Sequence, residues 1–120
     1  MSIKDRFFNR IFKNTNFFNN EKGFVFSIII PLYNTEKYLA DAIDSVINQT
    51  FDFQKVQIIL MDDGSTDSSA EICKEYCKKY PNNIEYYYQE NKGSSVTRNN
   101  SMKYTKGKWI NFLDSDDKLE

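Results

Sequence analysis

The sequence predicts an α/β domain in which a mainly parallel sheet is flanked by helices. Two observations lead to this prediction. Strand-like and helix-like patterns alternate from Phe24 onward, and polar residues gather where the expected strands end. Short connections between alternating elements require parallel strands with right-handed crossovers. Because open sheets of this kind bind ligands beyond the carboxyl ends of their strands, we expect the functional residues at that edge.

The composition bounds the possible functions. A chain of 120 residues with 40% hydrophobic and 16% aromatic residues is sufficient for one globular domain. Sixteen basic residues against 17 acidic ones lack the basic excess of nucleic-acid-binding domains, so no nucleic acid partner is expected. The absence of histidine excludes His-based triads and His metal ligands. Cys73 and Cys77 are too few for a zinc site, and we interpret them as small buried residues.

Residues 1–23 are expected to form an amphipathic or flexible leader, and residues 24–120 the folded part. Apolar leader residues recur at helical spacing between basic ones: Ile3, Phe7, Phe8, Ile11 and Phe12. This pattern fits a helix lying on a membrane surface, a helix packed on another part of the protein, or a frayed leader. No apolar run approaches the roughly 20 residues of a membrane span, and no signal peptide is evident. An intracellular protein is therefore expected.

The first predicted strand is Phe24–Pro31, a continuous apolar run typical of a buried parallel strand. We expect Pro31 to end it, because proline cannot donate a hydrogen bond to a neighbouring strand. Asn34 or Thr35 is then expected to cap a helix that ends near residues 49–50. The apolar stripe of that helix comprises Leu39, Ile43, Val46 and Ile47.

The second predicted strand, Val56–Met61, runs into an acidic turn at residues 62–65. Ser68 and Glu71 have the spacing of a capping box at the start of the next helix. Pro81 marks the end of that helix.

Three further elements complete the predicted β-α-β-α-β-α-β order. They are a strand at Ile84–Tyr88, a shorter helix at about Ser95–Tyr104 with Gly107 as its stop, and a strand at Lys108–Leu113.

Three carboxylates follow the fourth predicted strand, at Asp114, Asp116 and Asp117. They repel one another unless a cation or water screens them. Mg²⁺ and Mn²⁺ prefer oxygen ligands, and Mg²⁺ commonly takes one or two carboxylates together with substrate phosphates. The cluster is compatible with a divalent metal site that neutralises a leaving diphosphate, and equally with a solvated acidic cap.

Two acids and a glycine, Asp62, Asp63 and Gly64, follow the second predicted strand. A tight turn there would aim one carboxylate over the edge of the sheet, where it can accept from a uracil imide N–H or from ribose hydroxyls. The alternative is an Asx turn and helix cap. That alternative explains Asp67 and Ser68, but not both Asp62 and Asp63.

A third polar group consists of Asn91, Lys92 and Gly93 with Arg98 and Asn99. A cationic side chain here can pair with a phosphate or with one of the acids, although an exposed loop and a solvated helix face fit as well. Other phosphate-binding devices are excluded. With glycine only at positions 23, 64, 93 and 107, neither a G-x-G-x-x-G turn nor a P-loop can be written.

Taken together, these segments resemble the motifs of family 2 glycosyltransferases, which have the GT-A nucleotide-sugar-binding fold. The segments appear in the family's order and spacing and cover about residues 24–120. They are Ser27–Asn34, Ser45–Thr50, Met61–Asp67, Asn91–Gly93 with Arg98–Asn99, and Phe112–Asp117.

The resemblance implies inverting transfer of a sugar from a nucleoside diphosphate sugar, with a UDP-sugar as the expected donor, to the hydroxyl of an unknown acceptor. It implies Mg²⁺ or Mn²⁺ at the leaving diphosphate and a carboxylate base for the acceptor. The nucleotide-sugar-binding residues that it implies are Pro31, Tyr33, Glu36, Asp63, Arg98 and Asp114, and the metal ligand is Asp116. Among these, Asp63 would bind the base and Asp114 the ribose or donor sugar, while Asp62 supports the turn.

The family's base lies downstream of the D-x-D motif formed here by Asp114 and Asp116. We therefore assign no catalytic residue, expect the base beyond Glu120, and expect an incomplete glycosyltransferase domain. The family's frequent role in surface polysaccharide assembly favours a cytoplasmic enzyme working at the inner membrane face, which the leader would suit.

Two alternatives to an enzyme were weighed. One is a non-catalytic nucleotide-sugar-binding module or inactive fragment, which would bind the donor without transferring sugar. The other is a receiver-like phospho-acceptor domain. Such a domain needs an acid pair after its first strand, where this sequence instead has Pro31 to Asn34.

Overall fold

The computed structural model of the chain describes residues 23–49 and 52–115. Its elements follow the predicted order, with a short 3-10 helix added before the second strand. They are β1 (Phe26–Leu32), α3 (Leu39–Ile47), η1 (Phe53–Lys55), β2 (Val56–Asp62), α4 (Ser69–Lys79), β3 (Ile84–Tyr88), α5 (Ser94–Met102) and β4 (Trp109–Phe112). The predicted leader lies outside the described residues, apart from Gly23. Among the helices that are described, none has the length and apolar character needed to cross a membrane.

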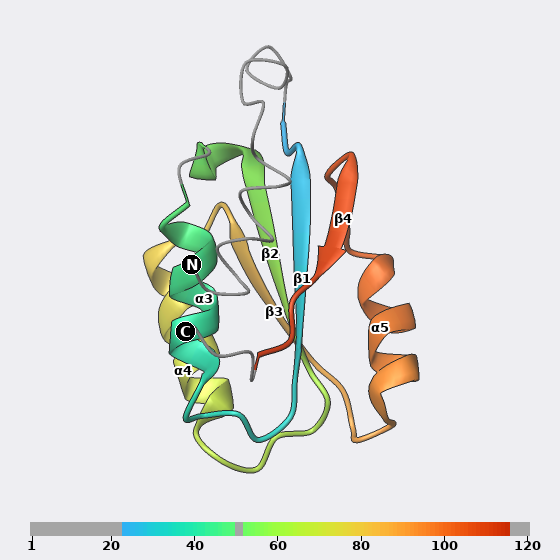
Figure 1. Cartoon of the computed structure of the whole chain (residues 1–120). Helices are drawn as coiled ribbons and strands as arrows, with labels where there is room; N and C mark the ends of the chain where they lie inside the picture. The colour runs from blue at the N-terminus through green and yellow to red at the C-terminus, as the bar shows by residue number, and fades with distance from the viewer. Residues whose placement is uncertain (1–22, 50–51, 116–120) are drawn as a thin grey trace.

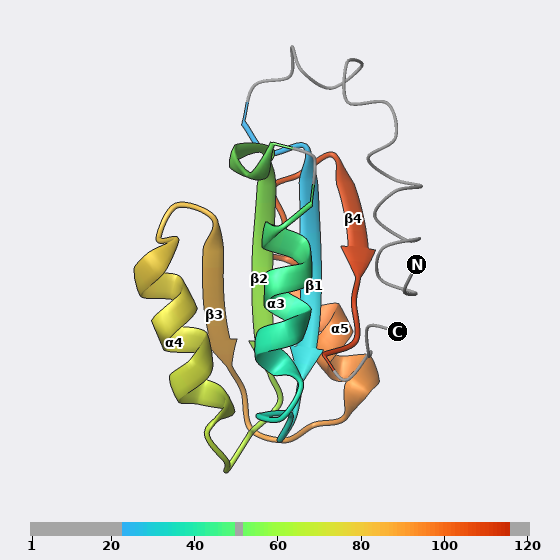
Figure 2. The ribbon, with the colours of Figure 1, turned by 60° about the vertical axis from the view of Figure 1, so that its left-hand side comes forward.

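The four strands form one parallel sheet in the order β3-β2-β1-β4. Helices α3 and α4 cover one face of the sheet and α5 covers the other, as Figures 1 and 2 show. The predicted fold class is therefore confirmed. The loops that leave β1, β2 and β3 at their carboxyl ends lie together, at the lower end of the sheet in Figure 1.

The core lies around the two central strands. All seven residues of β2 and six of the seven residues of β1 are buried, whereas β3 and β4 at the sheet edges are largely half-buried or exposed. Strands covered on both faces have no exposed side, which is why these two read as continuous apolar runs. Cys73 packs into this core as expected, and its burial raises the pKa of the thiol far above its ordinary value.

Contrary to expectation, Pro31 does not end the first strand. It pairs with Met61, and β1 continues to Leu32, which pairs with Asp62. Hydrogen bonds alternate between the two sides of a strand: Ile29 accepts from Leu113 on the β4 side, and Leu32 accepts from Asp63 on the β2 side. The ring nitrogen of Pro31 therefore faces the β4 side, beyond the end of β4. It removes no hydrogen bond between β1 and β2.

Neither predicted cap forms as expected. Helix α3 begins at Leu39, and its first hydrogen bond joins the Leu39 N–H to the Thr35 carbonyl. The carboxamide of Asn34 instead accepts from the N–H groups of Thr66 and Asp67, at 2.8 and 3.2 Å. Helix α4 begins after Ser68, whose side chain makes no capping hydrogen bond.

The Asp67 carboxylate takes over the capping of α4 by accepting from the Ser69 N–H at 2.9 Å. Asn34 thus bonds to the neighbouring loop instead of capping α3, whereas α4 is capped by the residue next to the predicted one.

A buried polar cluster joins the entry of β4 to the central strands. The Ser27 hydroxyl donates to Gln57 at 2.7 Å and accepts from the Gly107 N–H at 2.8 Å. Gly107 is predicted as the stop of the preceding helix, but α5 already ends at Met102. What requires a glycine is close approach, because a Cβ at position 107 would lie 2.7 Å from the Phe26 carbonyl carbon.

Candidate functional site

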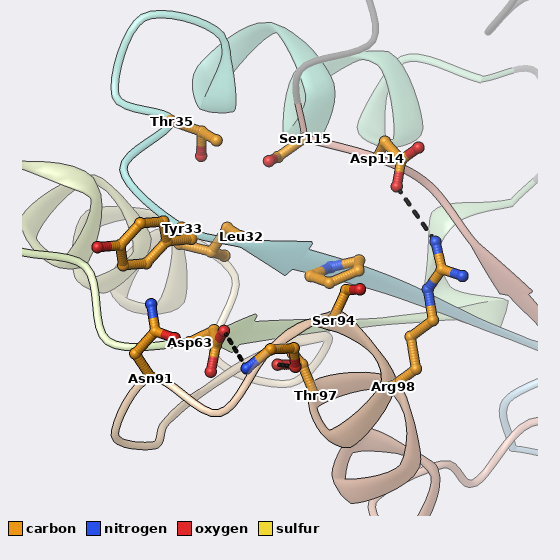
Figure 3. A pocket seen from close by; sticks show the side chains of 12 residues that line it. Leu32, Tyr33, Thr35, Asp63, Asn91, Ser94, Thr97, Arg98, Asp114 and Ser115 are labelled. Atoms are coloured by element: carbon orange, nitrogen blue, oxygen red, sulfur yellow. Dashed lines mark hydrogen bonds and ion pairs between the residues drawn. The ribbon is translucent and has the colours of Figure 1, made fainter.

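A cavity of about 380 Å³ opens at the carboxyl ends of the strands (Figure 3). Four stretches of chain that are distant in sequence meet around it: the end of β1 with the following loop, the end of β2, the β3–α5 loop with the first half of α5, and the residues after β4. This is where an open parallel sheet is expected to bind a ligand.

Five of the six predicted nucleotide-sugar-binding residues line the cavity: Pro31, Tyr33, Asp63, Arg98 and Asp114. Tyr33 brings an aromatic ring to the cavity wall, and the residue is 47% exposed. In Figure 3 the ring of Tyr33 and the carboxylate of Asp63 border one part of the cavity, and the Arg98 and Asp114 side chains border another.

Glu36 is not among the residues that line the cavity. Its carboxylate accepts from the Ser68 N–H at 3.0 Å, and its own N–H donates to Asp67 at 3.2 Å. The side chain therefore links the β1–α3 loop to the β2–α4 loop.

The predicted metal ligand, Asp116, lies outside the described residues. Over residues 23–49 and 52–115, no group of three or more His, Cys, Asp or Glu side chains is placed to hold a metal ion. Asp114 is described, and its carboxylate stands at the edge of the cavity with 58% of the side chain exposed.

Asp63 is 7% exposed and is held by three donors from the β3–α5 loop. Oδ1 accepts from Gln89 Nε2 and from the Lys92 N–H, both at 2.8 Å, and Oδ2 accepts from the Gly93 N–H at 3.1 Å. Burial alone would raise the pKa of this carboxyl group. The hydrogen bonds outweigh burial and hold the pKa below its ordinary value, so Asp63 is ionised at neutral pH.

Asp62 turns away from the cavity and supports the turn, as expected. Its Oδ1 accepts from the Ser65 N–H at 2.8 Å, and its Oδ2 accepts from the Tyr86 hydroxyl at 2.6 Å. Burial and this bond to a carboxylate raise the pKa of the Tyr86 hydroxyl above its ordinary value. The two successive acids therefore have different roles, because their side chains point to opposite sides of the strand end.

Gly64 is required by the close approach of two loops. Its φ is +90°, and a Cβ there would lie 2.8 Å from the backbone nitrogen of Asn91. A glycine lets the β2–α4 loop touch the β3–α5 loop directly, which brings the donors of the latter within reach of Asp63.

Arg98 and Asp114 face each other with 3.7 Å between Nη2 and Oδ1. Their side chains are 49% and 58% exposed, so the pair contributes little to stability. The guanidinium also lies over the Phe112 ring, 5.5 Å from its centroid. The first turn of α5, which carries no acidic residue, adjoins the cavity through Ser94 and adds the positive end of a helix dipole.

Other cavity residues were not predicted to bind the ligand: Thr35, Ser94, Thr97 and Ser115. Asn91 belongs to the third polar group of the sequence, but no ligand contact was assigned to it. The Thr35 hydroxyl is buried and, within the described part of the chain, has no hydrogen-bond partner. No spacing rule distinguishes such hydroxyls in a sequence, because they enter the site only through the meeting of loops.

Residues 27–120 match the family described as glycosyl transferase family 2. The minor teichoic acid biosynthesis protein GgaB of Bacillus subtilis (strain 168) is 54% identical over 100 residues, which make up 82% of this chain and 11% of that protein. The poly(ribitol-phosphate) beta-glucosyltransferase of Bacillus spizizenii is 44% identical over 92 residues, 76% of this chain and 14% of that protein. The chain thus spans less than a fifth of the length of either relative.

Solved structures share the fold. S. aureus TarS in complex with UDP-GlcNAc superposes with a TM-score of 0.70 and 32% identity, over 77% of this chain and 26% of that one. The mannosyltransferase PcManGT from Pyrobaculum calidifontis, in complex with GDP-Man and Mn²⁺, superposes with a TM-score of 0.71 over 89% of this chain and 34% of that one. At 16% identity the second likeness concerns the fold alone. The GT-A type of fold expected from the sequence is confirmed.

Proposed function

The chain belongs to glycosyl transferase family 2, and we propose that its cavity binds the nucleoside diphosphate part of a sugar donor, a UDP-sugar in the first instance. The observation that carries this proposal is the buried, ionised Asp63 carboxylate at the cavity wall, with the exposed Tyr33 ring beside it and Arg98 farther along. An aromatic ring can stack on a nucleobase, a hydrogen-bond acceptor can bind an N–H of that base, and a cation can bind the phosphates that follow.

The base would be read by Asp63. Its Oδ2 receives one hydrogen bond, so an acceptor position is left for the imide N–H of uracil. Cytosine has an acceptor at that place in the ring and would meet the carboxylate with repulsion. The UDP and UDP-GlcNAc complexes of TarS, a relative at 32% identity, favour the same choice of base.

The diphosphate would lie toward Arg98 and the first turn of α5. A guanidinium that is half-exposed and paired with an exposed carboxylate can turn to a phosphate at little cost. The Thr35 hydroxyl offers a further polar contact for the ligand, since it is buried in the cavity wall without a partner among the described residues.

We further propose that a divalent ion, Mg²⁺ or Mn²⁺, binds beside Asp114. Asp114 supplies an exposed carboxylate oxygen there, and Asp116 would be the principal ligand. Mg²⁺ requires only one or two carboxylates when phosphates and water complete its shell. The ion would supply charge neutralisation of the leaving diphosphate.

For the protein as a whole, the proposal is inverting transfer of the sugar to an acceptor hydroxyl in the assembly of a cell-surface polymer, at the cytoplasmic side of the membrane. The names of two relatives, a minor teichoic acid biosynthesis protein and a poly(ribitol-phosphate) beta-glucosyltransferase, support this class of acceptor. No described residue is assigned as the base. Donor binding without transfer would favour the alternative, a nucleotide-sugar-binding module.

Calorimetric titration of the purified chain with UDP, CDP and GDP, each with and without Mn²⁺, tests the proposal. We expect UDP to bind most tightly, and Mn²⁺ to strengthen its binding in the parent but not in Asp116→Ala. Asp41→Asn, which removes an exposed acid from α3, is the matched control and should bind as the parent does. A folded chain that binds none of the three nucleotides would refute the proposal.

A further inference from the structure

Gln89, the first residue after β3, connects the two parts of the cavity through its side-chain amide. Nε2 donates to Asp63 Oδ1 at 2.8 Å and to the Thr97 hydroxyl at 3.0 Å. Oε1 accepts from Asn100 Nδ2 at 2.7 Å. The Gln89 N–H donates to the Asp62 carbonyl at 2.9 Å, which anchors the residue to the end of β2. Both amide hydrogens and the amide oxygen therefore have partners.

The direction of every hydrogen bond in this network follows from Asp63. An ionised carboxylate can only accept, so the NH₂ group of Gln89 must face it and the amide oxygen must face Asn100. The Thr97 hydroxyl donates to the Gly93 carbonyl at 2.7 Å, which leaves its oxygen free to accept from Gln89. A half-buried network with a single consistent direction helps to hold its members in one orientation.

The network also decides which oxygen of Asp63 is available to a ligand. A carboxylate oxygen accepts about two hydrogen bonds, and Oδ1 already has two, from Gln89 and Lys92. Oδ2 has one, from Gly93, and keeps an open position. Without Gln89, both oxygens would have an open position and the carboxylate could rotate.

We propose that Gln89 is a positioning residue that sets base specificity: it locks Asp63 so that one acceptor position, on Oδ2, meets the nucleobase. The class of ligand it selects is a nucleotide whose base presents a ring N–H at that place, uracil rather than cytosine. Through Thr97 and Asn100 the same amide holds α5, the helix that carries Arg98. This inference rests on the proposed function and extends it to a residue that does not line the cavity.

Binding of UDP and CDP to the parent chain and to Gln89→Leu, measured by calorimetry from pH 4 to pH 8, tests the proposal. We expect UDP affinity to fall about 10-fold in the variant, as for the loss of a hydrogen bond to a charged group, and the preference for UDP over CDP to fall with it. UDP binding requires ionised Asp63 and is lost as pH falls through the pKa of that group. Removing a donor from the ionised form raises this pKa, so the loss should begin at a higher pH in the variant.

Two further variants keep the outcome interpretable. Gln89→Glu preserves the shape of the side chain but sets a carboxylate against Asp63, so UDP binding should be weak at pH 8 and recover as the new acid takes up a proton. Gln49→Leu removes an amide whose Nε2 donates to the Ser45 carbonyl near the far end of α3, and it should bind UDP as the parent does.

If Gln89→Leu lowers the melting temperature but keeps the parent's UDP affinity, UDP/CDP ratio and pH profile, Gln89 is structural only and the inference is overturned. A folded parent chain that binds no UDP would instead remove the proposed function itself. The two failures are therefore distinguishable within one set of titrations.

Discussion

The cavity is bordered by two groups of residues that are held in different ways. On the Asp63 side, comprising Asp63, Gly64 and the loop 89–93, a buried carboxylate accepts three hydrogen bonds and two loops touch through a glycine. On the Arg98 side, comprising Arg98 and Asp114, two charged groups stand 3.7 Å apart, each about half exposed. Both sides present charge to the same cavity, but only the first is built into the fold.

On the Asp63 side, a substitution should therefore change both the free energy of unfolding and the affinity for a ligand. On the Arg98 side, a substitution should change the affinity alone. A buried carboxylate with several donors costs free energy when any partner is removed, because the remaining polar groups stay buried. An exposed ion pair contributes little to the folded state, and its charges remain free to meet a ligand. The following substitutions test this contrast, in decreasing order of their expected effect on stability.

Gly64→Ala should lower the free energy of unfolding by about 2–4 kcal/mol, since the new Cβ meets both an unfavourable backbone conformation and the Asn91 backbone. Urea denaturation monitored by circular dichroism measures the change. Gly93→Ala is the matched control, because its φ of +94° is similar but nothing lies within 4 Å of the added Cβ. We expect that control to lose about 1–2 kcal/mol. Equal losses in the two variants would contradict the close approach of the loops.

Asp63→Asn should lower the free energy of unfolding by about 2 kcal/mol, because an amide nitrogen would face donors that the carboxylate now satisfies. UDP affinity should fall at least 10-fold in the same variant. Urea denaturation and calorimetric titration at pH 7 check the two effects. Unchanged stability with lost affinity would mean that the Asp63 side is no more integrated into the fold than the Arg98 side.

The stability advantage of the parent over Asp63→Asn should shrink in acid. The folded-state pKa of Asp63 lies below its ordinary value of 3.8, so its contribution is complete above that value and is lost as pH falls through the lower, folded-state pKa. Urea denaturation of both proteins between pH 5 and pH 2.5 measures the gap. The pKa of Asp67 is lowered as well, but its titration is common to both proteins and cancels in the difference. A gap that is constant with pH would be inconsistent with an ionised, hydrogen-bonded Asp63.

Arg98→Gln should change the free energy of unfolding by no more than about 0.5 kcal/mol, yet weaken UDP binding about 10-fold. Arg98→Lys, which keeps the charge but loses the planar fork, should recover part of the affinity. Denaturation and titration at two salt concentrations check both parts. A stability loss above about 1 kcal/mol in Arg98→Gln would show that the Arg98 side, too, is part of the fold.

The sequence was a good guide wherever structure depends on near neighbours. The positions of the central strands follow from continuous apolar runs, because strands buried on both faces tolerate little else. Five of the six residues inferred from family resemblance line the cavity. Ser68 does not cap α4, because the adjacent Asp67 does so. Asn34 does not cap α3, because its carboxamide accepts from N–H groups of the neighbouring loop, over 30 residues away. Such partners cannot be read from local spacing.

The same limit explains what was missed in the site. Gln89 belongs to it only through Asp63, which reaches it across a turn that Gly64 makes possible. Nothing in the residues surrounding Gln89 marks its amide as different from that of Gln49. The prediction that Pro31 ends the first strand was wrong for a related reason. Its effect on the sheet depends on which side of β1 its nitrogen faces, and that is known only once the strand order is known.

The two hydrogen bonds of the Ser27 hydroxyl, described above as part of a polar cluster, cannot form at the same time during synthesis of the chain. One partner, Gln57, follows 30 residues later, and the other, Gly107, follows 80 residues later. At synthesis rates of about 5–20 residues per second, the ribosome needs about 3–10 s to make the stretch between Gln57 and Gly107. During that interval β1 can already pair with β2, while its opposite edge waits uncovered for β4. A newly made chain is therefore more exposed to pairing with another copy at this edge of β1 before β4 emerges.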